Sequence, residues 1–495
     1  MPIFARMNVD PTIIIIVSAV LLFVSVLTSK TASRTGLPML TFFLLIGMLA
    51  GTDGIGKISF ENPETAQFLG IIALCFILYS GGLDTKFNQI KPILWRGITI
   101  ATLGVFITAF SLGAFVYWIT DFTLLESLLL GSIVSSTDAA TVISIFRSKS
   151  IGLKRNLRQT LELESGSNDP MAYFLILTFI SLIKQPDTSV WIMIPVFLKG
   201  MTLGAVMGYV IGKLTVRIIN KVNLFVEGLY PVLTIAMMLF SYSLTEFIGG
   251  NGFLSIYISG LIVGNSNFIH KRSLLTFYDG FAWLMQIMMF ITLGLLVFPS
   301  KMVPIIGIGV LISAFLMLIA RPLAMVICLL PFKTYYKDLT FVSWVGLKGA
   351  VPIIFATYPM VEKIPHADVI FHIVFFITLT SLMLQGTTLF SMANWLRLAI
   401  PEGKAKKSVL EFESESIKSV LEEFVVESDF RCVNHAIVDL QLPKTSLIVM
   451  IERGDKYFTP NGSTIIELGD RLIVLADTKA NASITYNALK AYHHT

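Results

Sequence analysis

Residues 161–180 read LELESGSNDPMAYFLILTFI, a stretch in which acidic residues lead directly into an apolar run. Together with its neighbours this run suits a helix that crosses the hydrocarbon core of a membrane, which takes about 20 mostly apolar residues. A charge near the bilayer centre costs at least about 2.5–3.5 kcal/mol, so an ionisable residue there is expected to be functional. Glu164 and Asp169 stand five positions apart, or roughly 140° apart around a helix. One carboxylate can therefore meet a partner helix while the other faces a cavity.

The same apolar character extends over most of the chain, which has 495 residues, 55% of them hydrophobic and 14% charged. Soluble globular chains are usually about 25% charged, so this composition indicates a lipid-facing protein. The apolar segments end near residue 400, and a polar, charged stretch follows. We therefore expect a membrane domain at residues 1–400, a linker at 401–413 and a small soluble domain at 414–495. Basic residues beside membrane segments explain the net charge of +5, so we expect no nucleic-acid partner.

Apolar windows of about 20 residues predict an all-α polytopic membrane protein with thirteen spans. The basic residues of the connections gather in alternate loops, such as the one that carries Lys154, Arg155 and Arg158, and are sparse in the opposite loops. By the positive-inside rule, the basic loops and the C-terminal domain are cytoplasmic and the N-terminus lies outside. The expected spans are residues 11–29, 35–51, 65–83, 93–118, 122–146, 159–183, 188–212, 228–247, 251–266, 276–298, 303–330, 339–359 and 366–396.

Two of these spans are predicted to be broken helices. The fifth contains Ser135-Ser136-Thr137-Asp138, a small-polar run that suits an unwound segment whose oxygens could bind a hard cation. Helix packing through small side chains is the alternative for Ser135 and Thr137. The twelfth contains Gly346-Leu347-Lys348-Gly349, which predicts a second break whose cation faces the dipole ends of the first. Snorkelling of Lys348 toward an interface is the alternative there.

Two further polar residues need partners inside the membrane. Arg321 lies well within the eleventh span, and Glu164 is its natural partner because an unpaired buried charge costs far more than a paired one. Asn168 stands beside Asp169 and can both donate and accept, which suits restraint of a carboxylate or a helix. The three cysteines have no spacing typical of a disulfide framework or a zinc site, so we expect no metal site and no cofactor.

Taken together, these motifs resemble the NhaP-type cation:proton antiporters of the sodium/proton exchanger family. The resemblance implies a thirteen-span fold with inverted repeats, a core domain that moves against a dimerisation domain, and a homodimer in a prokaryotic cytoplasmic membrane. It also implies electroneutral exchange of one cation for one proton, with a role in pH homeostasis. The matching strings are Ser136-Thr137-Asp138, Glu164-Ser165-x-x-Asn168-Asp169, Arg321-Pro322 and Gly346-Leu347-Lys348-Gly349-Ala350-Val351.

The family resemblance implies roles for individual positions. Asp169 would alternately hold a proton and a cation, and Asp138, Ser165 and the Thr137 carbonyl would complete the cation site. Asn168 would steady the core, as in the electroneutral branch, and Glu164 would pair with Arg321. Two positions depart from the family pattern: Ser80 stands where many members have an acid, and Lys348 where many have Arg.

The C-terminal domain resembles the TrkA-C (RCK-C) module of potassium-transport regulators, in which Gly-Asp-x-Leu is a recurring turn into a strand. Here that turn is Gly469-Asp470-Arg471-Leu472, and Gly469 is expected at positive φ. We expect a small α+β domain that binds a small cytosolic ligand or a nucleotide. No glycine-rich dinucleotide fingerprint precedes it. The module favours potassium as the exchanged cation. The expected strands are residues 436–440, 447–451, 464–466 and 467–475.

The rival functions are a sodium-selective antiporter, a ligand-gated cation channel, a carrier for an organic solute and an enzyme. A channel is disfavoured because the chain has no Thr-Val-Gly-Tyr-Gly filter and carries ionisable residues within its spans. An organic solute would need a larger pocket than a bare ion. The histidines have no nucleophile partner in view, so we expect no enzymatic activity. The sequence leaves sodium and potassium both open.

Overall fold

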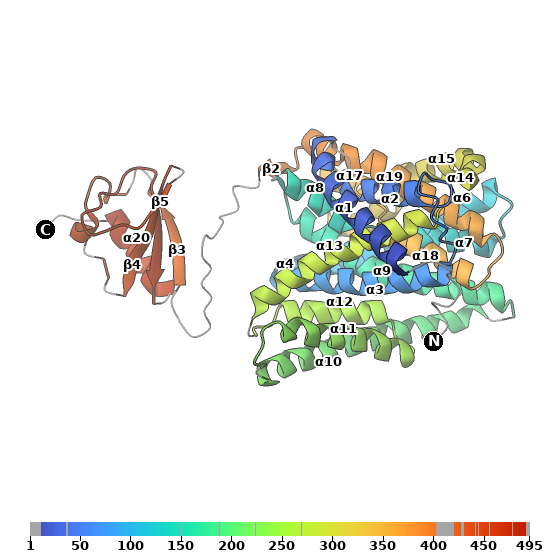
Figure 1. Cartoon of the computed structure of the whole chain (residues 1–495), viewed down its shortest axis with the longest axis horizontal. Helices are drawn as coiled ribbons and strands as arrows, with labels where there is room; N and C mark the ends of the chain where they lie inside the picture. Colours follow the sequence, from blue (N-terminus) through green and yellow to red (C-terminus); the bar gives the residue numbers. More distant parts are fainter. Residues whose placement is uncertain are drawn as a thin grey trace. The chain divides into compact units, whose positions relative to one another are not determined.

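The computed structural model describes residues 11–35, 38–149, 151–187, 189–222, 224–268, 270–401, 420–426, 430–440, 442–443, 445–454, 456–477 and 479–491. The chain divides into two compact units, Met1–Glu402 and Gly403–Thr495. The first unit is helical and the second contains a small sheet (Figure 1).

Within its described residues, the first unit has eight helical stretches that are long and apolar enough to cross a membrane. Shorter apolar helices accompany them, and each predicted span falls on a helical segment or a pair of such segments. The number of membrane crossings stays a prediction. The long stretches are α3 (Pro63–Asp84), Phe87–Ile119, α9 (Leu157–Lys184), α10 (Met193–Val222), α11 (Leu229–Phe247), α13 (Lys271–Leu295), Pro299–Phe332 and α19 (Ala367–Trp395). The shorter helices are α2 (Met39–Ala50), α7 (Leu124–Ile133), α12 (Gly252–Gly264), α18 (Ala350–Val361) and residues Ile15–Thr28 of α1 (Pro11–Thr35).

Two of the long stretches change their helical winding part-way along. The stretch Phe87–Ile119 contains a π-helical segment at Ile100–Gly104, and Pro299–Phe332 contains another at Leu316–Ala320. The second π segment ends directly before Arg321, the intramembrane cation of the sequence analysis. Single π turns are rare and often lie at functional positions. The π turn at Leu316–Ala320 agrees with this tendency, because a buried arginine, Arg321, directly follows it.

Both predicted breaks are present. Instead of one helix over residues 122–146, the chain forms α7 and then α8 (Ala139–Ser148). Instead of one helix over 339–359, it forms α17 (Tyr336–Trp344) and α18. α7 begins with a capping box, in which the Thr123 hydroxyl and the Glu126 carboxylate each accept a backbone N–H of the other's residue.

The sequence around Gly249 allows either a tight turn or a kink within one long helix, and the structure has a turn that separates α11 from α12. Gly249 has φ +78°, a conformation that favours glycine, and Asn251 then caps α12 by accepting the Leu254 N–H at 3.0 Å. Figure 1 shows α10, α11 and α12 side by side along one edge of the unit, next to α3. α12 packs closely on α3 because Gly260 and Gly82 let the two backbones touch.

A short antiparallel pair of strands joins two distant parts of the first unit. β1 (Ile151–Leu153) follows α8, and β2 (Ala399–Pro401) follows α19. Ile151 lies opposite Pro401, and Leu153 lies opposite Ala399. This pair of strands was not predicted, and Pro401 was expected in the linker. Pro401 instead ends a strand of the membrane unit.

The second unit is a four-stranded antiparallel sheet of order β3-β6-β4-β5. α20 (Lys479–Ala491) packs on the strands β3, β6 and β4, and the buried core includes Phe424, Ile451, Leu472 and Leu489. The small α+β domain is therefore as expected. The strands are β3 (Val420–Val425), β4 (Ser446–Arg453), β5 (Lys456–Phe458) and β6 (Arg471–Ala476).

The expected strands of this domain were partly wrong. Residues 447–451 lie in β4, and β6 begins at Arg471, within the expected 467–475, but Ile437–Leu440 form a 3-10 helix. Residues 464–466 contribute only an isolated bridge, Ala436 to Ile465. The turn before β6 is as predicted: Gly469 has φ +87°. The Arg453 guanidinium then donates two hydrogen bonds of 2.8 Å to the buried Asp470 carboxylate, which fixes the turn to β4.

Candidate cation and proton site

The two broken helices meet at their breaks. The Asp138 N–H, at the end of the α7–α8 break, donates to the carbonyl of Leu347 in the α17–α18 break at 2.8 Å. The Lys348 ammonium, 2% exposed, donates to the carbonyls of Ser135 at 3.3 Å and Ser136 at 3.0 Å. A side chain at Gly349 would collide with the Asp138 carboxylate. A helix end leaves carbonyls without intrahelical partners, so here the second break satisfies polar groups that the first has freed.

α9 holds the first break from its other side. The Ser165 hydroxyl donates to the Thr137 carbonyl at 2.9 Å and accepts the Ala139 N–H at 3.1 Å. The Asn168 amide donates to the Thr137 hydroxyl at 2.6 Å. These two polar residues stand three positions apart on α9, so both face the same break. The unwound backbone is therefore held between α9 and the second broken helix.

Asp169 points at the same break and is 3% exposed. The Ser136 hydroxyl donates a short hydrogen bond to its Oδ1. The neighbouring Asn168 Oδ1 is buried and accepts no hydrogen bond from the described residues. A buried carboxylate, a free amide oxygen and nearby backbone carbonyls form the kind of oxygen set that a hard monovalent cation prefers.

Asp138 has a second contact that the sequence did not predict. It is the N-cap of α8: its Oδ1 accepts the Thr141 N–H at 3.1 Å, and its Oδ2 accepts the Thr141 hydroxyl at 2.6 Å. The Asp138 side chain is half-buried. It therefore fixes the start of the helix that leaves the break, whichever ligand it also binds.

Glu164 and Arg321 lie together, as the sequence analysis expected. Arg321 Nη1 is 2.5 Å from Glu164 Oε1, and both side chains are almost fully buried. This pair joins α9 to α16 (Arg321–Leu329) on a face of α9 different from that of Asp169. Because Glu164 and Asp169 stand five residues apart, Glu164 can pair with Arg321 while Asp169 faces the break.

Several residues around the breaks were missed. Ser381 and Gln385 of α19 connect the two sides of the second break. The Lys348 N–H donates to Ser381 Oγ at 3.0 Å, and Ser381 Oγ donates to Gln385 Oε1 at 2.5 Å. Gln385 Nε2 in turn donates to the Trp344 carbonyl at 2.8 Å. Ser381 and Gln385 stand at i and i+4 and so share one face of α19, but the same helix also carries Thr378, Thr387 and Thr388, so the sequence did not single out this pair. Ser136 was quoted only as part of a motif, and nothing in the sequence singled out its bond to Asp169.

Comparison with known proteins places this arrangement in a family. The profile described as "Sodium/hydrogen exchanger, transmembrane" matches residues 19–395, which include both breaks and α9. The chain belongs to the sodium/hydrogen exchanger family. The TrkA-C domain profile matches residues 421–484 of the exchanger. The predicted family and C-terminal module are therefore confirmed.

Curated relatives cover most of the exchanger. It is 37% identical to the K(+)/H(+) antiporter NhaP of Alkalimonas amylolytica over 93% of this chain and 80% of that protein. It is 39% identical to the K(+)/H(+) antiporter NhaP2 of Shewanella sp. (strain ANA-3) over 94% of this chain and 81% of that protein. The structure of the sodium proton antiporter MjNhaP1 from Methanocaldococcus jannaschii matches with a TM-score of 0.68 at 23% identity, over 76% of this chain and 97% of that one. The fold is therefore that of a membrane-spanning cation/proton antiporter.

Proposed function

We propose that the exchanger carries potassium against protons by alternating access, and that Asp169 binds the two ions in turn. The observation that supports this most directly is the buried Asp169 carboxylate at the meeting point of two broken helices. Half-helix ends at such a point supply dipoles and unpaired carbonyls, the usual environment of a transported ion. A proton on Asp169 and a cation beside it compete for the same negative charge, so each excludes the other.

The groups proposed to bind the cation are Asp169, Asp138, Ser165, Asn168 and the Thr137 carbonyl. Ser165 and Asn168 each donate a hydrogen bond to Thr137. The Asn168 Oδ1 accepts no hydrogen bond from the described residues, and the Ser165 Oγ, which already accepts the Ala139 N–H, keeps one further acceptor site for a cation. Lys348 adds a fixed positive charge close by, held on the carbonyls of the first break. This charge would partly balance the two acids when no cation is bound.

The neutral Asn168 beside Asp169 supports an electroneutral cycle. With one titrating carboxylate at the centre, one proton leaves as one monovalent cation arrives, and the charge of the site is unchanged. A second titrating acid would break that balance, and Asp138 is the candidate because it lies at the same break.

Potassium is favoured over sodium because the curated relatives at 37% and 39% identity carry K(+)/H(+) antiporter as their name. A sodium-selective antiporter is the second candidate. It is supported by the Na(+)/H(+) antiporter 1 of Methanocaldococcus jannaschii, which is 25% identical over 69% of this chain. The ligand-gated channel is the more remote alternative.

We further propose a multi-pass homodimer of the cytoplasmic membrane with its C-terminus inside, active in pH homeostasis. Residues such as Val206, Tyr209 and Val210 of α10 are about half exposed, so this helix presents an apolar surface to lipid or to a second copy. The C-terminal domain would bind a small cytosolic ligand and regulate exchange.

Reconstitution tests the proposal. Proteoliposomes loaded with a pH-sensitive dye receive pulses of K⁺, Na⁺ or choline, and the dye reports proton flux. The native chain should respond to K⁺, and Asp169→Asn should abolish the response, since its amide cannot exchange a proton for a cation. Asp187→Asn, an exposed acid between α9 and α10, is the matched control and should exchange normally. Normal exchange by Asp169→Asn would exclude Asp169 as the shared site, and a response to Na⁺ alone would favour the second candidate.

A further inference from the structure

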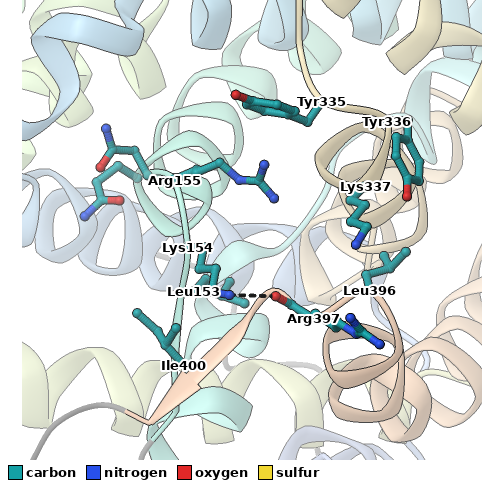
Figure 2. Close-up of a pocket in the computed structure, with 11 residues that line it drawn as sticks. Leu153, Lys154, Arg155, Tyr335, Tyr336, Lys337, Leu396, Arg397 and Ile400 are labelled. Carbon is teal, nitrogen blue, oxygen red and sulfur yellow. Dashed lines mark hydrogen bonds between the residues drawn. The ribbon is translucent and has the colours of Figure 1, made fainter.

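The first unit carries a basic hollow away from the ion site. This hollow, of about 900 Å³, opens where three segments of the unit come together: the turn from β1 into α9, the start of α17 and the end of α19. Figure 2 shows Arg155 and Lys337 on opposite sides of it, with Tyr335 at its rim. Its charged and aromatic lining is Lys154, Arg155, Lys337, Arg397, Tyr335 and Tyr336.

The charge of the hollow is strongly unbalanced. Arg155 is paired, with its Nη2 3.1 Å from Asp338 Oδ1. Within the described part of the chain, no carboxylate lies within ion-pair distance of Lys154, Lys337 or Arg397. Lys154 Nζ donates instead to the backbone carbonyl of Arg397 at 3.1 Å, which ties the turn after β1 to the end of α19 (Figure 2). Basic side chains that line one hollow without carboxylate partners favour an anion there.

Other features of the hollow also suit an anion. α9 begins at Leu157 with no side-chain cap on its first turn, and Asn156 and Gln159 of that turn face the hollow. The N-terminus of a 28-residue helix is a site where phosphate groups bind through backbone N–H donors. The planar guanidinium of Arg397 can donate two parallel hydrogen bonds to phosphate oxygens. The Arg155 guanidinium packs on the Tyr335 ring, 4.5 Å from its centroid.

We propose that this hollow binds a phosphate-bearing anion. The ligand is either the headgroup of an anionic phospholipid or a soluble phosphate compound, because both present the same oxygens to Lys154, Lys337 and Arg397. Tyr335 and Tyr336 are 65% and 71% exposed, and exposed aromatic residues at the edge of a membrane domain lie at headgroup level. Basic pockets of this kind bind lipid headgroups.

Occupancy would act on the ion site through the chain itself. The hollow joins the first turn of α9 to the segments that lead into α17 and out of α19. Asp169 lies ten residues beyond Gln159 on α9, or about 15 Å along the helix axis. α17 leads into the break that holds Lys348, and α19 carries the Ser381 and Gln385 bridge. An anion bound here would hold these three segments together at one end.

Binding by the full-length chain in detergent tests the proposal independently of transport. In one arm, native mass spectrometry counts bound phosphatidylglycerol against phosphatidylcholine. In the other, the midpoint of thermal unfolding is followed with inorganic phosphate against chloride at equal ionic strength. The test variant is Lys337→Gln/Arg397→Gln. The matched control is Lys213→Gln/Lys221→Gln, which removes two exposed cations of α10 that do not line the hollow.

We expect the native chain and the control to bind in at least one arm, and the test variant to bind at least tenfold more weakly there. Preference for phosphatidylglycerol alone identifies a lipid headgroup, and a phosphate-dependent rise in the unfolding midpoint identifies a soluble ligand. Equal binding by the test variant and the control, or binding in neither arm, overturns the proposal. If the double variant does not purify as a folded protein, Lys337→Gln alone carries the test, with an expected loss of about threefold.

Discussion

The Lys348 ammonium lies 3.0 Å from the carbonyl oxygen of Ser136, so a cation from one broken helix satisfies the open end of the other. The same Ser136 donates its hydroxyl to Asp169. Lys348 and Asp169 are therefore linked through one residue of the break. The charge of Lys348 stabilises the unwound conformation, and that conformation positions the donor to Asp169.

Loss of the Lys348 charge should therefore impair both stability and exchange. Lys348→Gln leaves buried carbonyls without a charged donor, which costs about 1–3 kcal/mol, and should reduce cation-driven proton flux at least tenfold. Lys348→Arg retains the charge, and we expect it to keep more exchange than Lys348→Gln. Thermal unfolding midpoints and dye flux in proteoliposomes measure the two effects. Lys363→Gln, an exposed lysine, is the control, and a fully active Lys348→Gln would show that the charge has no part in the cycle.

The Glu164–Arg321 pair should behave as one buried unit. Either Glu164→Gln or Arg321→Gln leaves a buried charge unpaired and should destabilise the protein by about 3–5 kcal/mol. The double variant should recover part of that loss, because it leaves neither charge behind. Denaturation of all four forms gives the coupling energy. Simple addition of the two single effects would show that the contact of 2.5 Å contributes no coupling.

Competition at one carboxylate predicts the dependence of exchange on pH and on voltage. At low pH Asp169 stays protonated and excludes the cation; at high pH too few protons are available for the return step. Exchange should be bell-shaped in pH, and a higher K⁺ concentration should shift the acidic limb to lower pH. The rate should not respond to a membrane potential set with valinomycin, because equal charges move in opposite directions. A clear voltage dependence would indicate unequal stoichiometry and a second titrating acid such as Asp138.

The sequence indicated which ionisable residues are buried within the membrane unit, because buried charges carry a large energetic cost. Arg321 and Lys348 stand in largely apolar segments, and Glu164 and Asp169 lead into one. The structure brings each of the four beside a polar partner. The sequence was a poorer guide to the residues that form hydrogen bonds around these ionisable side chains. Thr141 and Ser381 are small polar residues, and such residues occur in membrane helices for packing alone. Their partners depend on how two distant breaks cross, which no local pattern encodes.

In the C-terminal domain, too, some elements were predicted from the sequence and others were not. Strands β4 and β6 were found because each contains a short apolar run with β-branched residues, which is typical of a strand. β3 was missed because Glu422 and Glu423 make its segment charged, although Phe424 of the same strand is buried. Residues 436–440 are as apolar as a strand, yet Ile437–Leu440 form a 3-10 helix in which Val438 is 70% exposed. Composition does not distinguish these cases, because the difference lies in tertiary pairing.

The C-terminal domain is expected to regulate exchange without taking part in the transport step. The β1–β2 pair ends at Pro401, so a chain cut after Glu402 keeps the membrane unit and this pair intact, whereas a cut after Ile400 removes the pairing partner of Ile151. The chain cut after Glu402 should insert and still exchange cations in proteoliposomes, with an altered dependence on pH or on added nucleotides. A domain that binds a ligand can bias the inward or outward state only by its difference in affinity for the two.

The chain cut after Ile400 is the comparison, and should be less stable to heat because it lacks one strand position. Loss of all exchange from a well-inserted chain cut after Glu402 would show that the domain is needed for transport itself, and unchanged kinetics under every condition would show that it has no regulatory role.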